Sequence, residues 1–236
     1  MPENLLKRFW IERYNEQNPM ITFKNVSKRY PDGYIALNNV ELEVESGEMV
    51  FLTGHSGAGK STLLKLIAAI ERPTSGVIAI SGQNIAQLKS AAIPYLRRKI
   101  GFIFQDHKLL FDRNVFENVL LPLQISDFDN NTAMSRVRAA LDKVGLLKKE
   151  KVMPITLSGG ERQRLCIARA VVHRPAILIA DEPTGNLDIE YARDIMAMFK
   201  SFNQVGVTIL IATHDASLLD DTQHRILSLK QGKLAA

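Results

Sequence analysis

A glycine-rich segment that ends in a lysine and a serine carries the clearest chemistry in the chain. Residues 54–61 read Gly-His-Ser-Gly-Ala-Gly-Lys-Ser and follow the apolar run 49–53. Glycines let the backbone close round a polyphosphate, and the amide groups that start the next helix point at the anion. Lys60 would neutralise the terminal phosphates, and the Ser61 hydroxyl would bind Mg²⁺. The residues expected to contact a nucleotide here are Gly54, His55, Ser56, Gly57, Ala58, Gly59, Lys60, Ser61 and Thr62.

Two consecutive carboxylates end a second apolar run, residues 177–180. Neighbouring side chains of a strand point in different directions, so Asp181 and Glu182 suit different tasks. In a phosphoryl-transfer site, Asp181 would hold the Mg²⁺ shell, and Glu182 would polarise the water that attacks the γ-phosphate. The alternative for this pair is a helix N-cap. The phosphate-binding pattern about 120 residues upstream favours the catalytic interpretation.

A third segment, Leu157-Ser158-Gly159-Gly160-Glu161, precedes an expected helix over Arg162–His173. Ser158 is a good helix N-cap, and the two glycines leave backbone N–H groups uncovered at the helix start. The segment alone is therefore either a helix cap or a second anion site.

These motifs resemble those of the ATP-binding-cassette (ABC) ATPases. Residues 157–161 are similar to the signature motif of that family, and the phosphate loop, the carboxylate pair and an isolated His214 follow the family's order. The resemblance covers about residues 20–233. It implies an ABC ATPase fold that uses ATP and Mg²⁺, and it implies two copies that sandwich two ATP molecules head to tail.

The resemblance assigns further roles residue by residue. It implies that Tyr30 stacks on adenine, that Gln105 contacts Mg²⁺ and the attacking water, and that His214 contacts the γ-phosphate. The implied catalytic set is Glu182, His214 and Gln105, and the implied metal set is Ser61, Gln105 and Asp181. The alternatives are a turn-flanking aromatic for Tyr30, a strand-end amide for Gln105 and a capping histidine for His214.

Other residues would act across the subunit interface. In the family, Ser158, Gly159 and Gly160 of one copy bind the ATP of the other, and the segment 185–188, which ends in Asp188, crosses between the copies. This chain has Glu161 where Gln is commoner, and Gly185-Asn186 where many members have Ser-Ala. Both departures occur within one branch of the family.

That branch is the one that acts in bacterial cell division. The residues that resemble it include His55 and Ala58, the stretches 70–73, 101–110 and 140–147, and 181–188. The resemblance implies an ATPase at the cytoplasmic face of the inner membrane, at the division site. Its partner would be an FtsX-like integral membrane protein, whose movement regulates peptidoglycan hydrolysis, and division-ring proteins are a further expected partner class. The alternatives are a lipoprotein-releasing or macrolide-export transporter ATPase, or an ATP-gated scaffold with slow turnover.

The elements that position these residues alternate between strand and helix, which predicts an α/β fold with a mainly parallel core sheet. An antiparallel part is expected at the N-terminal side and an inserted helical subdomain over about 112–165. The expected strands are Ile21–Val26, Val40–Val44, Met49–Thr53, Val77–Ile80, 100–104, Ala176–Ala180 and Thr208–Thr213, and the expected helices include Thr62–Ile70 and Met134–Val144. Apolar and aromatic residues after Gln105 are expected to form a groove for the membrane partner: Leu109, Leu110, Phe111 and Phe116.

Composition is consistent with one domain of 236 residues, 46% of them hydrophobic, with a net charge of +5. The basic residues are spread along the chain, and no nucleic-acid partner is expected. The single cysteine, Cys166, is expected to be packed in a helix. Residues 1–19 are expected to be an extension of the ATPase domain 20–236. Their apolar and basic residues suit either an amphipathic helix on the membrane surface or a tail.

Overall fold

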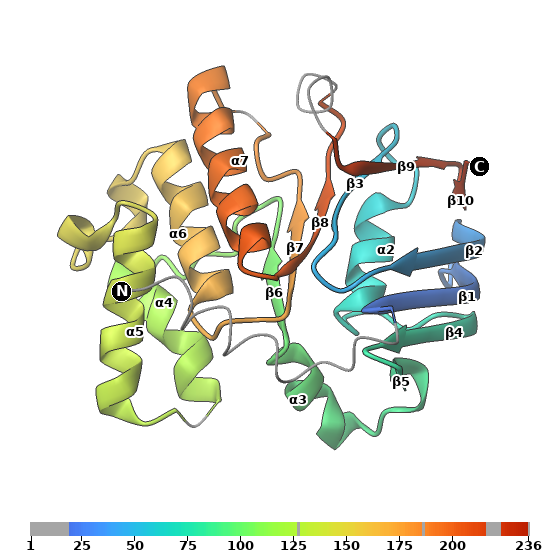
Figure 1. The fold of residues 1–236 in the computed structure, drawn as a ribbon, viewed down its shortest axis with the longest axis horizontal. Coiled ribbons are helices and arrows are strands. Elements are labelled where there is room, and N and C mark those ends of the chain that lie inside the picture. Colours follow the sequence, from blue (N-terminus) through green and yellow to red (C-terminus); the bar gives the residue numbers. More distant parts are fainter. Residues whose placement is uncertain (1–18, 127, 186, 216–222, 236) are drawn as a thin grey trace.

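The strands among the described residues form two sheets (Figure 1). The computed structural model describes residues 19–126, 128–185, 187–215 and 223–235. The expected extension therefore lies outside the described residues except for Pro19, and so does Asn186. The described strands are β1 Ile21–Arg29, β2 Ile35–Val44, β3 Met49–Thr53, β4 Ser75–Ile80, β5 Gln83–Asn84, β6 Ile100–Ile103, β7 Ile177–Asp181, β8 Thr208–Ala212, β9 Arg225–Lys230 and β10 Lys233–Leu234. The described α-helices are α2 Lys60–Ile67, α3 Ile93–Arg97, α4 Val115–Ile125, α5 Asn130–Lys143, α6 Gly159–Val171 and α7 Ile189–Gln204.

The larger sheet has the order β10-β9-β3-β8-β7-β6, and its neighbours from β9 to β6 run parallel. Its central strands are buried on both faces, as continuous apolar runs require. In β3, Phe51 belongs to one hydrophobic cluster, whereas Val50 and Leu52 belong to a second cluster on the other face. Parallel strands place their C-terminal ends at one edge of a sheet, so β3, β6, β7 and β8 deliver the residues that follow them to the same edge.

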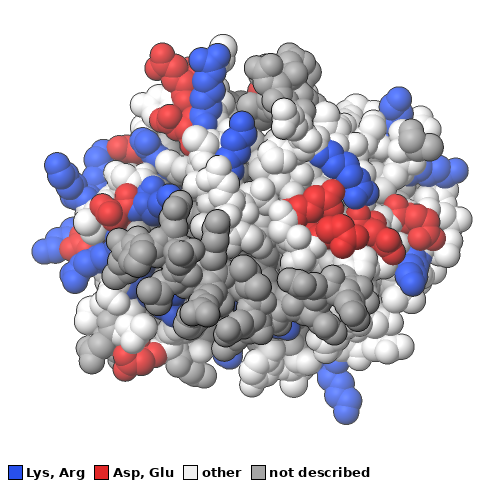
Figure 2. Space-filling view, viewed as in Figure 1, with Lys and Arg blue, Asp and Glu red and all other residues white. Residues whose placement is uncertain are grey.

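The smaller sheet is antiparallel, with the order β2-β1-β4-β5. It confirms the antiparallel part expected from the sequence, although β1 and β2 are longer than expected. Apolar side chains of β1, among them Ile21 and Phe23, are buried against α2 and the core sheet in the second cluster. Acidic side chains gather over β2 on the face shown in Figure 2, while lysines and arginines gather over the segment between α5 and α6.

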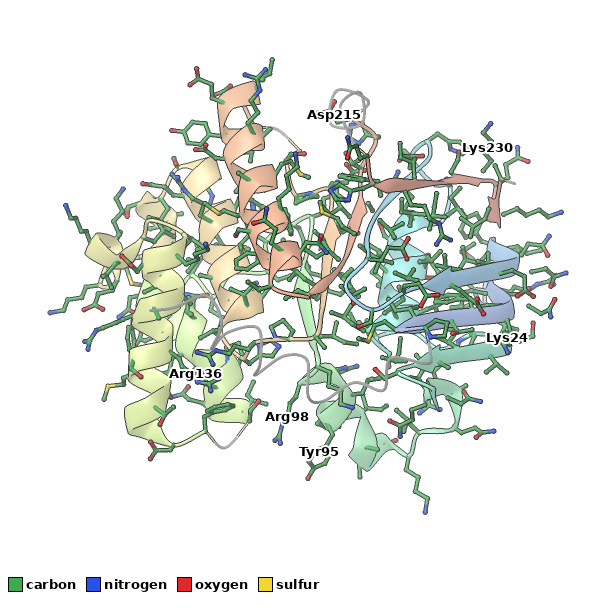
Figure 3. All side chains as sticks on the ribbon, viewed as in Figure 1. Lys24, Tyr95, Arg98, Arg136, Asp215 and Lys230 are labelled. Carbon is green, nitrogen blue, oxygen red and sulfur yellow. The ribbon has the colours of Figure 1, made fainter. Side chains whose placement is uncertain are left out.

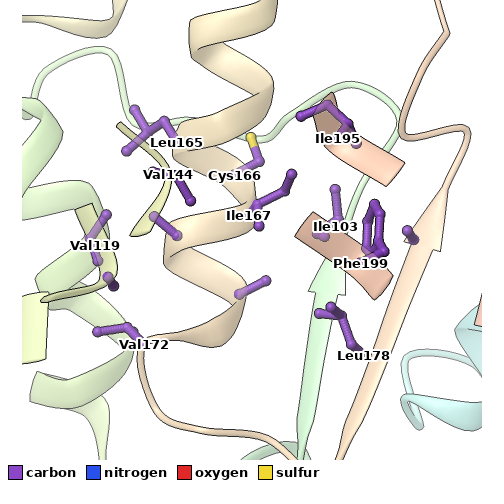
Figure 4. Close-up of a cluster of buried hydrophobic side chains, with 14 of the residues drawn as sticks. Ile103, Val119, Val144, Leu165, Cys166, Ile167, Val172, Leu178, Ile195 and Phe199 are labelled. Atoms are coloured by element: carbon purple, nitrogen blue, oxygen red, sulfur yellow. The ribbon is translucent and has the colours of Figure 1, made fainter. Parts of the chain in front are cut away.

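Three helices, α4, α5 and α6, pack against one another at one side of the molecule (Figure 1). We call this group the helical lobe. Ile167 of α6 faces Ile103 of β6 and Phe199 of α7, which joins the helical lobe to the core sheet (Figure 4). Cys166 is buried there, as expected, and burial raises the pKa of its thiol to about 12.

Two helix boundaries differ from the expectation. α6 begins at Gly159 instead of Arg162, because Ser158 forms a capping box with Glu161. α2 covers Lys60–Ile67 instead of Thr62–Ile70, and Ala69 beyond its end has the left-handed φ of 49°. In the part of the chain that the structure describes, no helix is long and apolar enough to cross a membrane.

Candidate nucleotide site

The loop between β3 and α2 needs glycine at two positions. Gly54 has a φ of 150°, and a Cβ added there would lie 2.3 Å from the carbonyl oxygen of Leu229. Gly59 has a φ of 109°, and its added Cβ would lie 2.4 Å from the carbonyl oxygen of Ala36. Any side chain would push the loop away from these neighbouring strands. The glycines therefore fix a tight loop whose amide groups surround a cavity.

That cavity has a volume of about 500 Å³, a size that suits a small-molecule ligand. It brings together residues that are far apart in the sequence, because β6, β7 and β8 end beside the loop. Ser158, Gly159, Gly160 and Asp188 are not among its lining residues. The lining residues are Tyr34, His55, Ser56, Gly57, Ala58, Gly59, Lys60, Ser61, Thr62, Gln105, Glu182 and His214.

Lys60 is buried and is held by groups of its own chain. Its ammonium donates a hydrogen bond of 2.6 Å to the carbonyl of Gly54 and lies 3.6 Å from Oε1 of Glu182. These oxygens supply the negative charge that a buried ammonium needs. Phosphate oxygens in the cavity can replace them, so the lysine is in place for a polyphosphate.

Asp181 is 6% exposed and lies close to Ser61. Burial raises the pKa of its carboxyl group, while the Ser61 hydroxyl lowers it. Its Oδ1 atom is buried without a hydrogen-bond partner among the described residues. A carboxylate oxygen without a partner beside a hydroxyl is a suitable ligand set for Mg²⁺. The residues present thus fit the ion that the sequence implies.

Glu182 has an unusual backbone conformation. Its φ of 51° lies in the left-handed region, which residues other than glycine rarely adopt. This conformation costs about 1–2 kcal/mol, and strained residues of this kind occur at functional sites. The Glu182 amide donates to the carbonyl of Ala212, which ties it to β8. Its Oε2 accepts a bond from the backbone N–H of His214 and lies 2.9 Å from Nδ1 of that histidine. The carboxylate is therefore aimed into the cavity from a fixed position.

Gln105 is exposed at the end of β6 and lies on the cavity wall, as the sequence suggested. Two and three residues further on, His107 and Lys108 both have left-handed backbones, with φ of 61° and 48°. Arg169 of α6 donates hydrogen bonds of 2.5 and 2.6 Å to the carbonyls of these two residues. The segment after Gln105 is thus attached to the helical lobe.

Tyr34 is a site residue that sequence reasoning missed. Its hydroxyl donates to the carbonyl of Gly57 at 2.7 Å, and it lines the cavity. Tyr30, the residue expected to stack on adenine, lies beneath it with parallel rings and centroids 6.3 Å apart. The Tyr30 hydroxyl lies 3.3 Å from Oγ1 of Thr62 and the ring does not line the cavity, so its role stays a prediction. The turn residues between the two tyrosines could have indicated that Tyr34 folds back beside Tyr30.

The signature segment lies at an exposed helix start. Ser158 is exposed, and its side chain caps α6 by accepting a bond from the Glu161 amide. Lys149 holds Glu161 through an ion pair of 2.5 Å. A Cβ added to Gly160 would lie 3.0 Å from Tyr191 of α7, so a larger residue would disturb the packing of α6 on α7. The segment does not line the nucleotide cavity of its own chain.

Comparisons with known proteins agree with this geometry. Residues 37–185 match the family model described as ABC transporter. The chain is 57% identical over 215 residues to the cell division ATP-binding protein FtsE of Escherichia coli (strain K12), which covers 91% of this chain and 97% of that protein. The dimeric structure of a bacterial ABC transporter cassette matches with a TM-score of 0.85 and 36% identity, over 92% of this chain and 97% of that one.

A structure of the same cassette in a post-hydrolysis state, bound to ADP and phosphate, also matches. Its TM-score is 0.85 and its identity 35%, again over 92% of this chain and 97% of that one. The similarity to relatives thus extends through the phosphate loop, the carboxylate pair and the signature segment. This chain belongs to the ABC transporter ATPases, in the family of the cell division ATP-binding protein FtsE.

Proposed function

We propose that this protein hydrolyses ATP with Mg²⁺ as a homodimer and that the cycle moves an FtsX-like membrane protein, which regulates peptidoglycan hydrolysis in bacterial cell division. The observation that carries the hydrolytic part is the arrangement of Asp181 and Glu182. One buried carboxylate has a free oxygen beside Ser61, and the next points into the same cavity from a strained backbone. A protein that only binds nucleotide does not need the second carboxylate.

Each site residue has a distinct task in this proposal. Ser61, Gln105 and Asp181 would hold Mg²⁺, and that ion would neutralise charge on the phosphates. Lys60 exchanges Gly54 and Glu182 for phosphate oxygens when ATP enters. Glu182, released from Lys60 but still held by His214, is then free to accept a proton from the attacking water. Phosphoryl transfer depends mainly on positioning and charge, which these side chains supply.

Dimerisation would give the signature segment a phosphate to bind. Ser158, Gly159 and Gly160 lie outside the nucleotide cavity of their own chain, so a second copy must bring its ATP to them. The matching cassette that is described as dimeric supports this arrangement. Asp188, exposed at the start of α7, lies near the same surface, because a Cβ added to Gly159 would lie 4.0 Å from the side chain of Leu187 beside it.

The membrane partner is expected to dock beside Gln105. Of the residues proposed for that groove, Leu109 is 7% exposed and Phe116 packs against the core, so these two are structural. Phe111 is 51% exposed and remains available. Asn118, fully buried on α4, holds this segment by hydrogen bonds to the backbone of Leu110 and Arg113. Phe111 is thus presented on a fixed loop of the helical lobe.

We place the protein at the cytoplasmic face of the inner membrane, at the division site. Division-ring proteins are a further proposed partner class, and we propose residues 20–236 as the ATPase domain, with the helical lobe as its moving part. The names of the relatives, which refer to cell division, favour this function over lipoprotein release or macrolide export.

The test is co-expression with an FtsX-like membrane protein. The wild-type complex should hydrolyse ATP only with Mg²⁺, and Phe111→Glu should abolish co-purification while ATP binding is retained. Ile125→Glu, at an apolar position of α4 that is more exposed than Phe111, is the matched control and should leave co-purification intact. Mg²⁺-independent hydrolysis, or full co-purification of the Phe111 variant, would contradict the proposal.

A further inference from the structure

The start of α6 carries a carboxylate close to Ser158 of the signature segment. Oε2 of Glu161 accepts a hydrogen bond of 3.0 Å from the Ser158 amide, and the Glu161 amide donates to the Ser158 hydroxyl oxygen at 3.2 Å. A hydroxyl that accepts a hydrogen bond can still donate its own proton. Under the proposed function that proton would go to the ATP of the second copy. A negative side chain therefore lies next to the place where a negative ligand must bind.

Lys149 holds this carboxylate from outside the helix. Its ammonium lies 2.5 Å from Oε1 of Glu161, the oxygen that does not cap α6. The hydrogen bonds from Lys149 and from the Ser158 amide lower the pKa of the Glu161 carboxyl group. Lys149 ends the 3₁₀-helix Leu147–Lys149, twelve residues before Glu161. The fold of the helical lobe, and not the spacing within one helix, thus brings the two charges together.

The arginines of this region are engaged by other groups. Arg162 donates to a backbone carbonyl at 3.0 Å, and the guanidinium of Arg164 lies 5.7 Å from the centre of an aromatic ring of α7. Arg136 lies beside the opposite end of α6 (Figure 3), where it stacks on an aromatic ring. Among the described residues, Lys149 is the one cation that forms an ion pair with Glu161.

The exposure of this ion pair indicates that stability is not its main contribution. The side chain of Lys149 is 45% exposed and that of Glu161 is 19% exposed, and ion pairs at a protein surface add little to stability. The situation changes when a second copy covers the start of α6, because excluding water strengthens the interaction between charges. An unbalanced Glu161 carboxylate would then repel the phosphate.

We propose that Lys149 is a positioning residue of the signature segment: it neutralises Glu161, so that the start of α6 accepts the ATP of the other copy while the carboxylate keeps its capping role. This inference rests on the proposed function, which supplies the ATP and the second copy. Lys149 acts through Glu161 and does not itself contact the phosphate. Glutamate at a position where glutamine is commoner is thus matched by a lysine that offsets its charge.

The test measures the ATP concentration at which half of the Glu182→Gln cassettes are paired, by sedimentation with the membrane partner supplied. Adding Lys149→Met should raise this midpoint about tenfold, because the Glu161 carboxylate stays ionised at pH 7 without its partner. Lys149→Arg should restore most of the loss. In the background of Glu161→Gln, whose amide oxygen can still cap α6, Lys149→Met should cause no further rise. ADP, which lacks the γ-phosphate, should bind to the cavity of its own chain equally well with and without Lys149→Met.

Arg138→Met is the matched control, because Arg138 pairs with Glu150 in the same lobe at comparable exposure, and it should leave the midpoint unchanged. An equal rise for Lys149→Met in the Glu161→Gln background would overturn the proposal, since Lys149 would then act on the phosphate itself. Weaker ADP binding would also overturn it by showing that Lys149 is structural. A dimer that forms with ATP but ignores Lys149→Met would overturn this inference alone, whereas no ATP-dependent dimer of the Glu182→Gln protein would contradict the proposed function as well.

Discussion

Asp181, the residue proposed to hold Mg²⁺, illustrates how a residue kept for function can reduce the stability of its own protein. Burial raises the pKa of this carboxyl group in the folded state above its value in the unfolded chain. At neutral pH the unfolded chain holds Asp181 ionised in water, so the buried charge destabilises the fold. This destabilisation begins to shrink as the pH falls through the raised pKa and the folded state takes up a proton, and it is gone below the pKa of the unfolded chain.

Asp181→Asn is therefore expected to raise the urea midpoint of the nucleotide-free protein at pH 7, and the gain should shrink as the pH is lowered. The same variant should lower Mg²⁺-dependent hydrolysis by about 100-fold or more, because a neutral amide is a weaker ligand for the ion. Asp142→Asn, at an exposed position of α5, is the control. Unchanged hydrolysis, or a lower urea midpoint at pH 7, would show that Asp181 is structural.

At the residue scale, the sequence predicted most of the nucleotide cavity. Lys60, Ser61 and the carboxylates were identified because each carries a charge or hydroxyl at a spacing that phosphate chemistry requires. Tyr34 was missed because its contact depends on how a turn folds back on Tyr30, which no spacing rule describes. The prediction that Leu109 lines a docking groove is wrong, since Leu109 is buried in the core. The sequence alone does not show whether an apolar side chain faces the core or the surface.

At the element scale, Arg169 connects the segment after Gln105 to α6. Its guanidinium donates to the carbonyls of His107 and Lys108, whose left-handed backbones need such support. The Cys166 thiol adds a weaker contact to the His107 carbonyl. The signature segment starts the same helix, so α6 connects the segment after Gln105 to Ser158.

Arg169→Met should loosen this connection. Hydrogen bonds to a charged group contribute about 1.5–3 kcal/mol each, so amide exchange over residues 106–110 should accelerate by about tenfold or more. ATP binding should be retained. The value of kcat should fall, because the signature segment no longer moves together with Gln105. Arg138→Met removes an arginine of the helical lobe that bonds only a side chain, and exchange over 106–110 should not change in that control. Unchanged exchange in Arg169→Met would show that other contacts hold the segment.

The sequence predicted the order of strands and helices well, since apolar runs and turn residues mark them locally. It placed helix ends less well. The start of α6 depends on a capping box between Ser158 and Glu161, and the end of α2 on a left-handed Ala69. α4 also continues through Pro122, which is normally a helix breaker. These details are decided by packing and by single hydrogen bonds, which periodicity does not report.

At the scale of the whole molecule, the account requires two copies. The nucleotide cavity of one chain contains Lys60 and Glu182 but not its own signature segment, which lies at the exposed start of α6. ATP is therefore expected to act as the contact between copies, and its hydrolysis is expected to separate them. Neither composition nor periodicity indicates this arrangement, because it depends on which surfaces remain uncovered after folding.

The most direct test is sedimentation of the Glu182→Gln variant with the membrane partner supplied, with and without ATP and Mg²⁺. The amide keeps the shape of the side chain but cannot accept the proton of the attacking water, so hydrolysis should fall by orders of magnitude while ATP stays bound. We predict two closed, ATP-bound cassettes with ATP and separated ones without it. Separated cassettes in both conditions, or hydrolysis at the wild-type rate, would contradict the account.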